Sequence, residues 1–175
     1  RPDNERHFCE AVIRRPVDGV IIVPTHLTDE DIDRFIALTQ TPVVALGQHI
    51  GHPDVDVVWA DDQKATSEAI RWLIAERGHR RIGFINGNPA FTFALHRDRG
   101  YRRALAGAGI EFDPEIIQCG AFTDETGFLF GRALLSHPNP PTGLVVGSVQ
   151  SALGVMRSVR IAGSAADELS ICTKS

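Results

Sequence analysis

Short apolar runs and amphipathic segments alternate along the whole chain. The apolar runs, such as Val20–Val23, are rich in Val and Ile and lack the polar alternation of a half-exposed strand. Continuous apolar runs of this kind are typical of strands that are buried on both faces of a parallel sheet. The amphipathic segments space their apolar residues three and four apart, which predicts helices. The alternation therefore predicts an α/β fold of parallel sheets flanked by helices.

Local signals set the expected ends of these elements. Thr28 is a predicted N-cap, because three acids follow it in the first turn. The predicted helices are residues 3–14, the segments opened by Thr28 and by Asp61-Asp62, and residues 97–108, 125–136 and 149–162. The predicted strands lie within residues 17–24, 42–46, 55–60, 81–86, 115–121, 143–148 and 169–172. Because the pattern restarts after Gly78, we expect two lobes, residues 1–78 and 79–175, joined near Gly78-His79.

The composition fits a folded domain that does not itself bind nucleic acid. Hydrophobic residues make up 43% of the 175 residues and charged residues 23%, which is close to the globular average. The formal net charge is −4, whereas a domain that grips DNA is usually basic. No apolar run is long enough to span a bilayer. The three cysteines, Cys9, Cys119 and Cys172, contain no C-x-x-C pair and predict buried, reduced thiols in the cytoplasm.

The sequence lacks the motifs of common enzyme sites. No phosphate-binding P-loop, dinucleotide-binding glycine pattern, nucleophile elbow or zinc-protease motif is present. His49 and His52 are three residues apart, but nothing nearby completes the three or four ligands of a zinc site. We therefore expect no catalytic residues, no cofactor and no metal.

A series of short segments carries a resemblance to a known family. The segments are Val17–Pro24, Thr41–Val44, Asp61-Asp62, Arg77–Ile85, Arg97–Tyr101, Asp113-Pro114, Gly127-Phe128, Pro140–Leu144 and Gln150–Gly154. In this order they resemble the effector-binding domain of the LacI/GalR transcription regulators. The resemblance implies a two-lobed, periplasmic-binding-protein-like fold that holds a ligand between its lobes. It also implies that the DNA-binding headpiece and the first βαβ unit lie outside this chain.

Candidate ligand-binding residues follow the strands, because ligands of open α/β sheets bind at the carboxyl ends of the strands. Arg97 matches the family's ligand-binding arginine, and its guanidinium could donate to hydroxyls or a carboxylate. The alternative is a surface arginine at a helix start. Phe122 matches a position where an aromatic ring stacks on the ligand, although a core phenylalanine is equally compatible. Phe91 and Phe93 predict either an apolar pocket or a capped loop.

Two departures from the family pattern bear on the ligand. Ser148-Val149 stands where the family commonly has Asn-Asp, and Ser148 could still bond a ligand hydroxyl. Ser175 aligns with an aspartate that takes sugar hydroxyls in many relatives, and Lys174 adds a positive charge beside it. Fewer acids together with Arg97 and Lys174 suggest an anionic effector, such as a sugar acid or a phosphate ester.

The resemblance implies a function as the effector-sensing domain of a LacI-type repressor. The implied partners are a sugar or sugar-derived metabolite, operator DNA through a headpiece not present here, and a second copy in a homodimer. Side helices such as residues 3–14 are the expected dimer contact. The alternative is a periplasmic sugar-binding protein of a transport system, because such receptors share the fold. Unpaired cysteines favour the cytoplasmic regulator.

Overall fold

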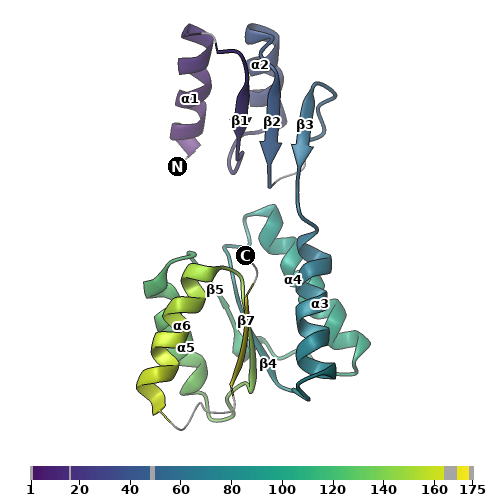
Figure 1. Ribbon diagram of the computed structural model, residues 1–175, viewed down its shortest axis with the longest axis vertical. Coiled ribbons are helices and arrows are strands. Elements are labelled where there is room, and N and C mark those ends of the chain that lie inside the picture. The colour runs from purple at the N-terminus through teal and green to yellow at the C-terminus, as the bar shows by residue number, and fades with distance from the viewer. Residues whose placement is uncertain (1, 16, 48–49, 164–168, 174–175) are drawn as a thin grey trace. The chain divides into compact units, whose positions relative to one another are not determined.

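The computed structural model describes residues 2–15, 17–47, 50–163 and 169–173. The chain divides into two compact units, Arg1–Ala60 and Asp61–Ser175 (Figure 1). This boundary corrects the lobes expected at residues 1–78 and 79–175. Helix α3 (Asp62–Ala75) buries Ile70 and Leu73 in the core of the second unit, so it belongs to that unit.

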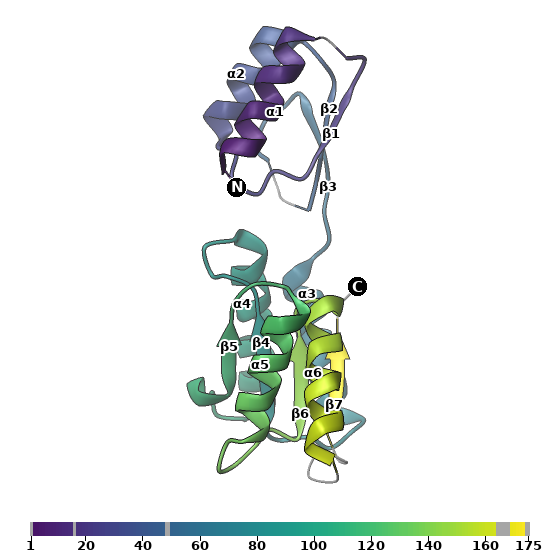
Figure 2. The same ribbon diagram turned by 90° about the vertical axis from the view of Figure 1, so that its left-hand side faces the viewer.

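The first unit is a three-stranded parallel sheet covered on one face. Its strands β1 (Val20–Ile22), β2 (Val43–Leu46) and β3 (Val55–Val58) lie in the order β1-β2-β3. Helices α1 (Pro2–Arg14) and α2 (Asp29–Thr39) pack together on one face (Figure 2). Between helices and sheet lies the core, which includes Val12, Ile32, Phe35, Val43 and Ala45. The prediction that the Val20–Val23 run is buried on both faces is wrong. Strand β1 alternates buried and exposed residues, and Ile21 at its centre is 71% exposed, because the helices cover one face of this sheet.

The start of α2 shows how the local sequence signal works. Thr28 is its N-cap, and the Thr28 hydroxyl accepts a hydrogen bond from the backbone N–H of Asp31. The Asp31 carboxylate accepts in return from the backbone N–H of Thr28, which completes a capping box. The helix start predicted at Thr28 is confirmed.

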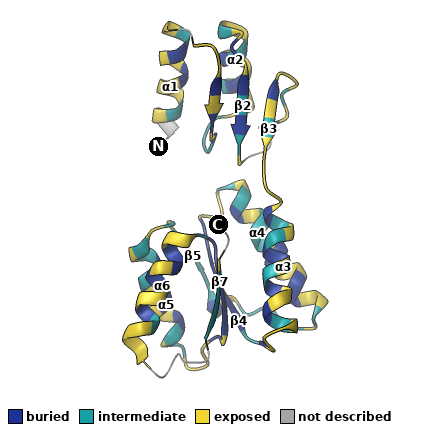
Figure 3. Cartoon of the chain, in the orientation of Figure 1, coloured by how far each residue is buried: buried dark blue, intermediate teal, exposed yellow. Residues whose placement is uncertain are grey.

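The second unit is a four-stranded parallel sheet covered on both faces. Its strands are β4 (Ile82–Asn86), β5 (Ile117–Cys119), β6 (Gly143–Val146) and β7 (Ser170–Thr173), in the order β5-β4-β6-β7. Helices α3 and α4 (Thr92–Gly107) flank one face, and α5 (Asp124–Leu135) and α6 (Val149–Ala162) flank the other (Figure 1). Every residue of β4 and β6 is buried (Figure 3).

Two elements of the second unit differ from the sequence expectation. Helix α4 begins at Thr92 rather than at residue 97, and its N-cap Phe91 makes no side-chain cap hydrogen bond. Because Phe91 gives no capping signal, the sequence did not reveal the first turn. The expected strand at 115–121 is shorter, since a 3-10 turn over Pro114–Ile116 precedes β5 and is capped by Asp113.

The three cysteines are free, but they are not uniformly buried. Cys9 is buried, as expected, whereas Cys172 is half-buried and Cys119 is exposed. Cys119 ends β5, which is an edge strand of the second sheet, and this position explains its exposure. Within the described residues, no helix is both long and apolar enough to cross a membrane.

Candidate functional site

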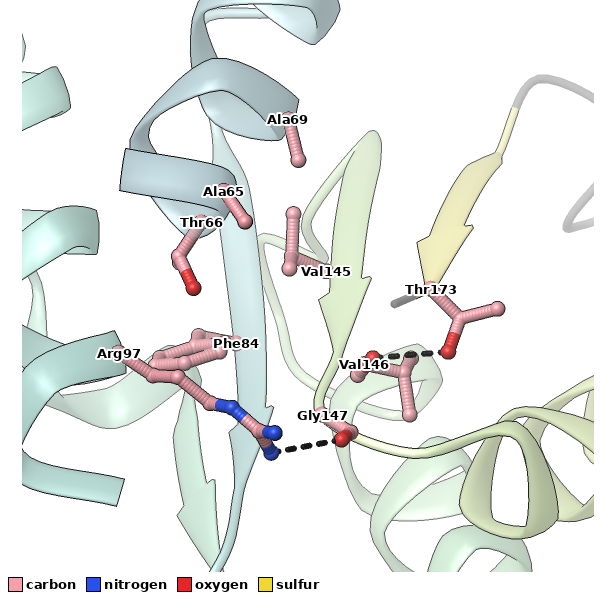
Figure 4. Close-up of a pocket in the computed structure, with 9 residues that line it drawn as sticks. All are labelled: Ala65, Thr66, Ala69, Phe84, Arg97, Val145, Val146, Gly147 and Thr173. Atoms are coloured by element: carbon pink, nitrogen blue, oxygen red, sulfur yellow. Dashed lines mark hydrogen bonds between the residues drawn. The ribbon is translucent and has the colours of Figure 1, made fainter. Parts of the chain in front are cut away.

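Arg97 reaches the carboxyl edge of the second sheet. The Arg97 side chain extends from the second turn of α4, and its Nη1 donates a 2.8 Å hydrogen bond to the carbonyl oxygen of Gly147 (Figure 4). Gly147 directly follows β6, so the guanidinium lies where parallel strands end. The sequence placed Arg97 at the head of its helix, but it lies one turn further in.

Asp62 is the second partner of this guanidinium. The Nε of Arg97 donates a 2.8 Å hydrogen bond to Oδ1 of Asp62, and the two side chains are only 15% and 10% exposed. Asp62 lies in the first turn of α3, where the helix dipole also favours a carboxylate. From the sequence, Asp61-Asp62 was one of the segments that resemble the family and was expected to open a helix, but the contact of Asp62 with Arg97 was not predicted.

The three candidate phenylalanines lie together beside Arg97. The rings of Phe91 and Phe93 are stacked with centroids 5.3 Å apart, and the Phe93 and Phe122 centroids are 5.9 Å apart. The Cζ atom of Arg97 lies 5.2 Å from the Phe93 centroid and 5.5 Å from that of Phe122. A guanidinium within about 6 Å of a ring centroid is attracted to the aromatic face. Arg97, Phe91, Phe93 and Phe122 therefore form one group.

Two glycines allow Phe122 to approach the sheet edge. A Cβ atom at Gly87 would lie 2.7 Å from the Phe122 ring, and one at Gly147 would lie 3.0 Å from it. Real Cβ atoms essentially never come as close as the first of these distances. Asn86 shapes the same turn, because its side chain accepts from the Gly87 N–H and donates to the Ala94 carbonyl, each at 2.8 Å. None of these three residues carries a sequence signal that marked it as part of the site.

Arg97 keeps hydrogen-bonding capacity for a ligand. A guanidinium has five N–H donors, and hydrogen bonds within the described residues use the Nε donor and one Nη1 donor. A pocket of about 280 Å³ adjoins Arg97 (Figure 4). Its other lining residues come from α3, the strands and the turn after β6: Ala65, Thr66, Ala69, Phe84, Val145, Val146, Gly147 and Thr173. This volume is close to the lower end of the roughly 300–1,000 Å³ typical of ligand pockets.

Of the two candidate serines, the structure describes Ser148. Ser148 is the N-cap of α6, where its hydroxyl accepts a 3.1 Å hydrogen bond from the Ser151 N–H and also bonds the Ser151 hydroxyl at 3.0 Å. The Ser148 hydroxyl is thus engaged inside the protein. Ser175 and Lys174 lie outside the described residues.

The expectation of an anionic ligand loses one of its premises here. It rested on a shortage of acids, and Asp62 supplies an acid in direct contact with Arg97.

Among the described residues, no group of three or more His, Cys, Asp or Glu could hold a metal ion. His52 bonds the Asp54 N–H at 3.0 Å and lies 3.5 Å from Asp33, and His49 lies outside the described residues.

The arrangement in the second unit defines a class of protein: a parallel α/β domain with a largely buried arginine, Arg97, at its strand ends. The family described as periplasmic binding proteins and sugar binding domain of LacI family matches residues 2–174. The chain belongs to this family.

Known relatives are transcription regulators. The chain is 37% identical over 164 residues to the HTH-type transcriptional regulator AglR of Rhizobium meliloti (strain 1021). The aligned region covers 93% of this chain and 46% of that protein. It is 31% identical over 160 residues to the HTH-type transcriptional repressor CytR of Escherichia coli (strain K12), with coverage of 91% and 46%. The chain thus spans about half the length of these curated relatives.

Solved structures of the same family share the fold. A sugar-binding transcriptional regulator of the LacI family from Escherichia coli, complexed with phosphate, superposes with a TM-score of 0.83 at 25% identity, covering 98% of this chain and 62% of that one. The transcriptional regulator CelR in complex with cellobiose gives a TM-score of 0.79 at 27% identity, with coverage of 97% and 52%. The expected two-lobed family fold is confirmed, and the relatives favour the regulator over the transport protein.

Proposed function

We propose that this chain is the effector-binding part of a LacI-type transcriptional repressor. The observation that carries the proposal is Arg97, which lies at the strand ends of the second unit with N–H donors left for a ligand. In the whole protein, a separate headpiece binds operator DNA, and the effector changes that binding. Such a change requires the effector to bind two arrangements of the protein with different affinity.

The proposed effector is a small sugar or a sugar-derived metabolite. The remaining donors of Arg97 suit hydroxyl oxygens, and the rings of Phe93 and Phe122 suit the apolar face of a sugar ring. One relative of the same fold is described as a complex with cellobiose. We also propose that the protein is a cytoplasmic homodimer and has no enzyme activity. Light scattering during gel filtration tests the dimer directly.

The ligand site is tested by substituting Arg97 and measuring sugar binding. Calorimetry with a panel of neutral sugars and their sugar acids identifies a ligand. The affinity of the Arg97→Lys variant for that ligand is then compared with the affinity of the unsubstituted protein. Lysine keeps the charge but lacks the planar fork of arginine. Because hydrogen bonds to charged groups contribute about 1.5–3 kcal/mol, we expect affinity to fall roughly 10- to 100-fold.

Arg99→Lys is the matched control, because Arg99 lies on the same helix and is exposed. Its affinity should equal that of the unsubstituted protein. Unchanged affinity in Arg97→Lys would reject the assignment of the site.

The identity of the whole protein is tested by the intact mass and N-terminal sequence of the native protein. A longer chain that opens with a helix-turn-helix segment supports the regulator. A processed N-terminus from which an export signal has been removed would overturn it in favour of a transport receptor.

A further inference from the structure

The Arg97–Asp62 pair is the feature of the site that the family resemblance did not lead us to expect. Both side chains are largely buried, and the Nε–Oδ1 distance is 2.8 Å. A buried charge is costly unless it is paired, so each group compensates the other. A ligand that enters the adjoining pocket therefore meets a guanidinium that is already paired with a carboxylate.

The pair also fixes the orientation of the guanidinium. Asp62 binds Nε from α3, and the Gly147 carbonyl binds Nη1 from the end of β6. With two of its edges held, the planar group presents its remaining N–H donors in a fixed direction. Its Cζ is at the same time held 5.2 Å from the Phe93 ring centroid and 5.5 Å from that of Phe122.

We propose that Asp62 determines the charge specificity of the Arg97 site: it makes the site accept uncharged, hydroxyl-bearing ligands and disfavour anions. The inference rests on the proposed function in taking Arg97 as the residue that contacts the ligand. A hydroxyl oxygen can accept from the positioned donors without a net charge in the site. An anion would have to approach the buried carboxylate of Asp62 as well as the guanidinium.

The Asp62→Asn variant tests this inference, with inorganic phosphate as the probe. Asparagine has nearly the same shape, and its amide oxygen can still accept from Nε of Arg97, but the compensating charge is lost. Calorimetric titration of the full chain should show at least about a tenfold gain in phosphate affinity over the unsubstituted protein. Adding Arg97→Gln to Asp62→Asn should abolish that gain, because the gain is due to the guanidinium.

Asp61→Asn is the matched control. Asp61 is the exposed N-cap of α3, and its side chain accepts a 2.8 Å hydrogen bond from the Lys64 N–H. Asparagine caps helices as well as aspartate does, so this variant removes one negative charge next to Asp62 without a change in fold. Its phosphate affinity should stay within about twofold of the unsubstituted protein. A similar gain in Asp61→Asn, or no gain in folded Asp62→Asn, overturns the inference.

A measurement on the unsubstituted protein keeps the test decisive even if Asp62→Asn does not fold. The NMR resonance of the Arg97 Nε–H should be unaffected by inorganic phosphate, and a phosphate-dependent shift would overturn the inference.

Phosphate binding requires neither a sugar nor DNA, so this test is independent of the proposed sugar site. A phosphate gain in Asp62→Asn alongside unchanged sugar affinity in Arg97→Lys would therefore reject the proposed sugar site and leave the charge balance supported.

Discussion

The carboxyl edges of the two sheets use their hydrogen-bond donors in different ways. After β1 in the first unit, the backbone N–H groups of Thr25, His26 and Leu27 donate to one carboxylate oxygen of Glu5 at 3.1, 2.9 and 3.2 Å. The Thr25 hydroxyl donates to the other oxygen. At the corresponding edge of the second unit, hydrogen bonds within the described residues leave N–H donors of Arg97 unused. The two edges therefore differ in their donors, and this difference is the reason that we propose a ligand site at the second edge and not at the first.

The two sheets also differ in how much of their surface is covered. Both faces of the second sheet carry helices, and its central strands β4 and β6 are fully buried (Figure 3). The first sheet carries helices on one face, and Ile21 and Val23 remain 71% and 61% exposed on or next to β1. Strand residues should therefore contribute very differently to stability in the two units.

The largest expected effect is the loss of a buried ring from the second sheet. Phe84 in β4 is 1% exposed and stacks on Tyr101 with ring centroids 5.0 Å apart. Phe84→Ala should lower the free energy of unfolding of the second unit by about 3–5 kcal/mol, because it removes contacts and leaves a cavity. Hydrogen exchange measured for each unit checks this, since two compact units need not unfold in one transition.

Ile21→Thr is the counterpart in the first sheet. It should change the stability of that unit by no more than about 0.5 kcal/mol, as is usual for exposed positions. A cost as large as that of Phe84→Ala would show that the two sheets do not differ in this respect.

A smaller effect on stability is expected at the edge of the first unit where Glu5 accepts the hydrogen bonds, and this effect depends on pH. Burial opposes ionisation of Glu5, but hydrogen bonds from the Thr25 hydroxyl, the His26 ring and the His26 N–H outweigh burial and lower the pKa of Glu5 from 4.5 to about 2. Because the folded pKa lies below the unfolded one, the stabilisation is fully present above pH 4.5 and is lost as the pH falls towards 2. The linkage relation gives about 3 kcal/mol at neutral pH.

Urea titrations between pH 6 and pH 2 measure this dependence. Glu5→Gln should destabilise the first unit at neutral pH and flatten its acid dependence. Glu10→Gln is the control, because Glu10 lies on the same helix and makes only a 3.9 Å exposed ion pair with Arg14. If the stability of both variants depends on pH in the same way, Glu5 is not the group whose ionisation stabilises the first unit.

Sequence reasoning found most elements and placed its candidate site residues after the strands, because both follow from local or repeating signals. Apolar runs marked β4 and β6, and Thr28 marked the start of α2. Parallel strands place their ends at one edge, so Arg97 and Phe122 could be expected together without knowledge of their contacts.

The features that sequence reasoning missed depend on packing between distant segments. Asp62 and Arg97 are 35 residues apart, and their contact requires α3 to pack beside α4. The apolar stripe of α3 could in principle face either sheet, so the boundary after Ala60 could not be inferred from periodicity. The first turn of α4 was also missed, because its N-cap Phe91 makes no side-chain hydrogen bond and so gives no capping signal in the sequence.

The smallest expected effect is at Ser148. It tests whether a polar group that is already hydrogen-bonded within the protein takes part in ligand binding. Its hydroxyl caps α6 through the Ser151 N–H at 3.1 Å. Ser148→Ala should lower the stability of the second unit by about 1 kcal/mol through the lost cap, and Ser148→Asp should restore it. Because this hydroxyl is engaged within the protein, sugar affinity measured by calorimetry should change less than about twofold.

Thr123→Ala is the matched comparison for this cap. Thr123 caps α5 by accepting a 3.2 Å hydrogen bond from the Thr126 N–H, and it follows Phe122 at the same edge. The two variants should lose similar stability and keep similar affinity. Should Ser148→Ala instead weaken sugar binding as strongly as Arg97→Lys while Thr123→Ala does not, the Ser148 hydroxyl must leave its cap to meet the ligand. Hydrogen bonds seen within the protein would then be a poor guide to which groups at this edge are available for binding.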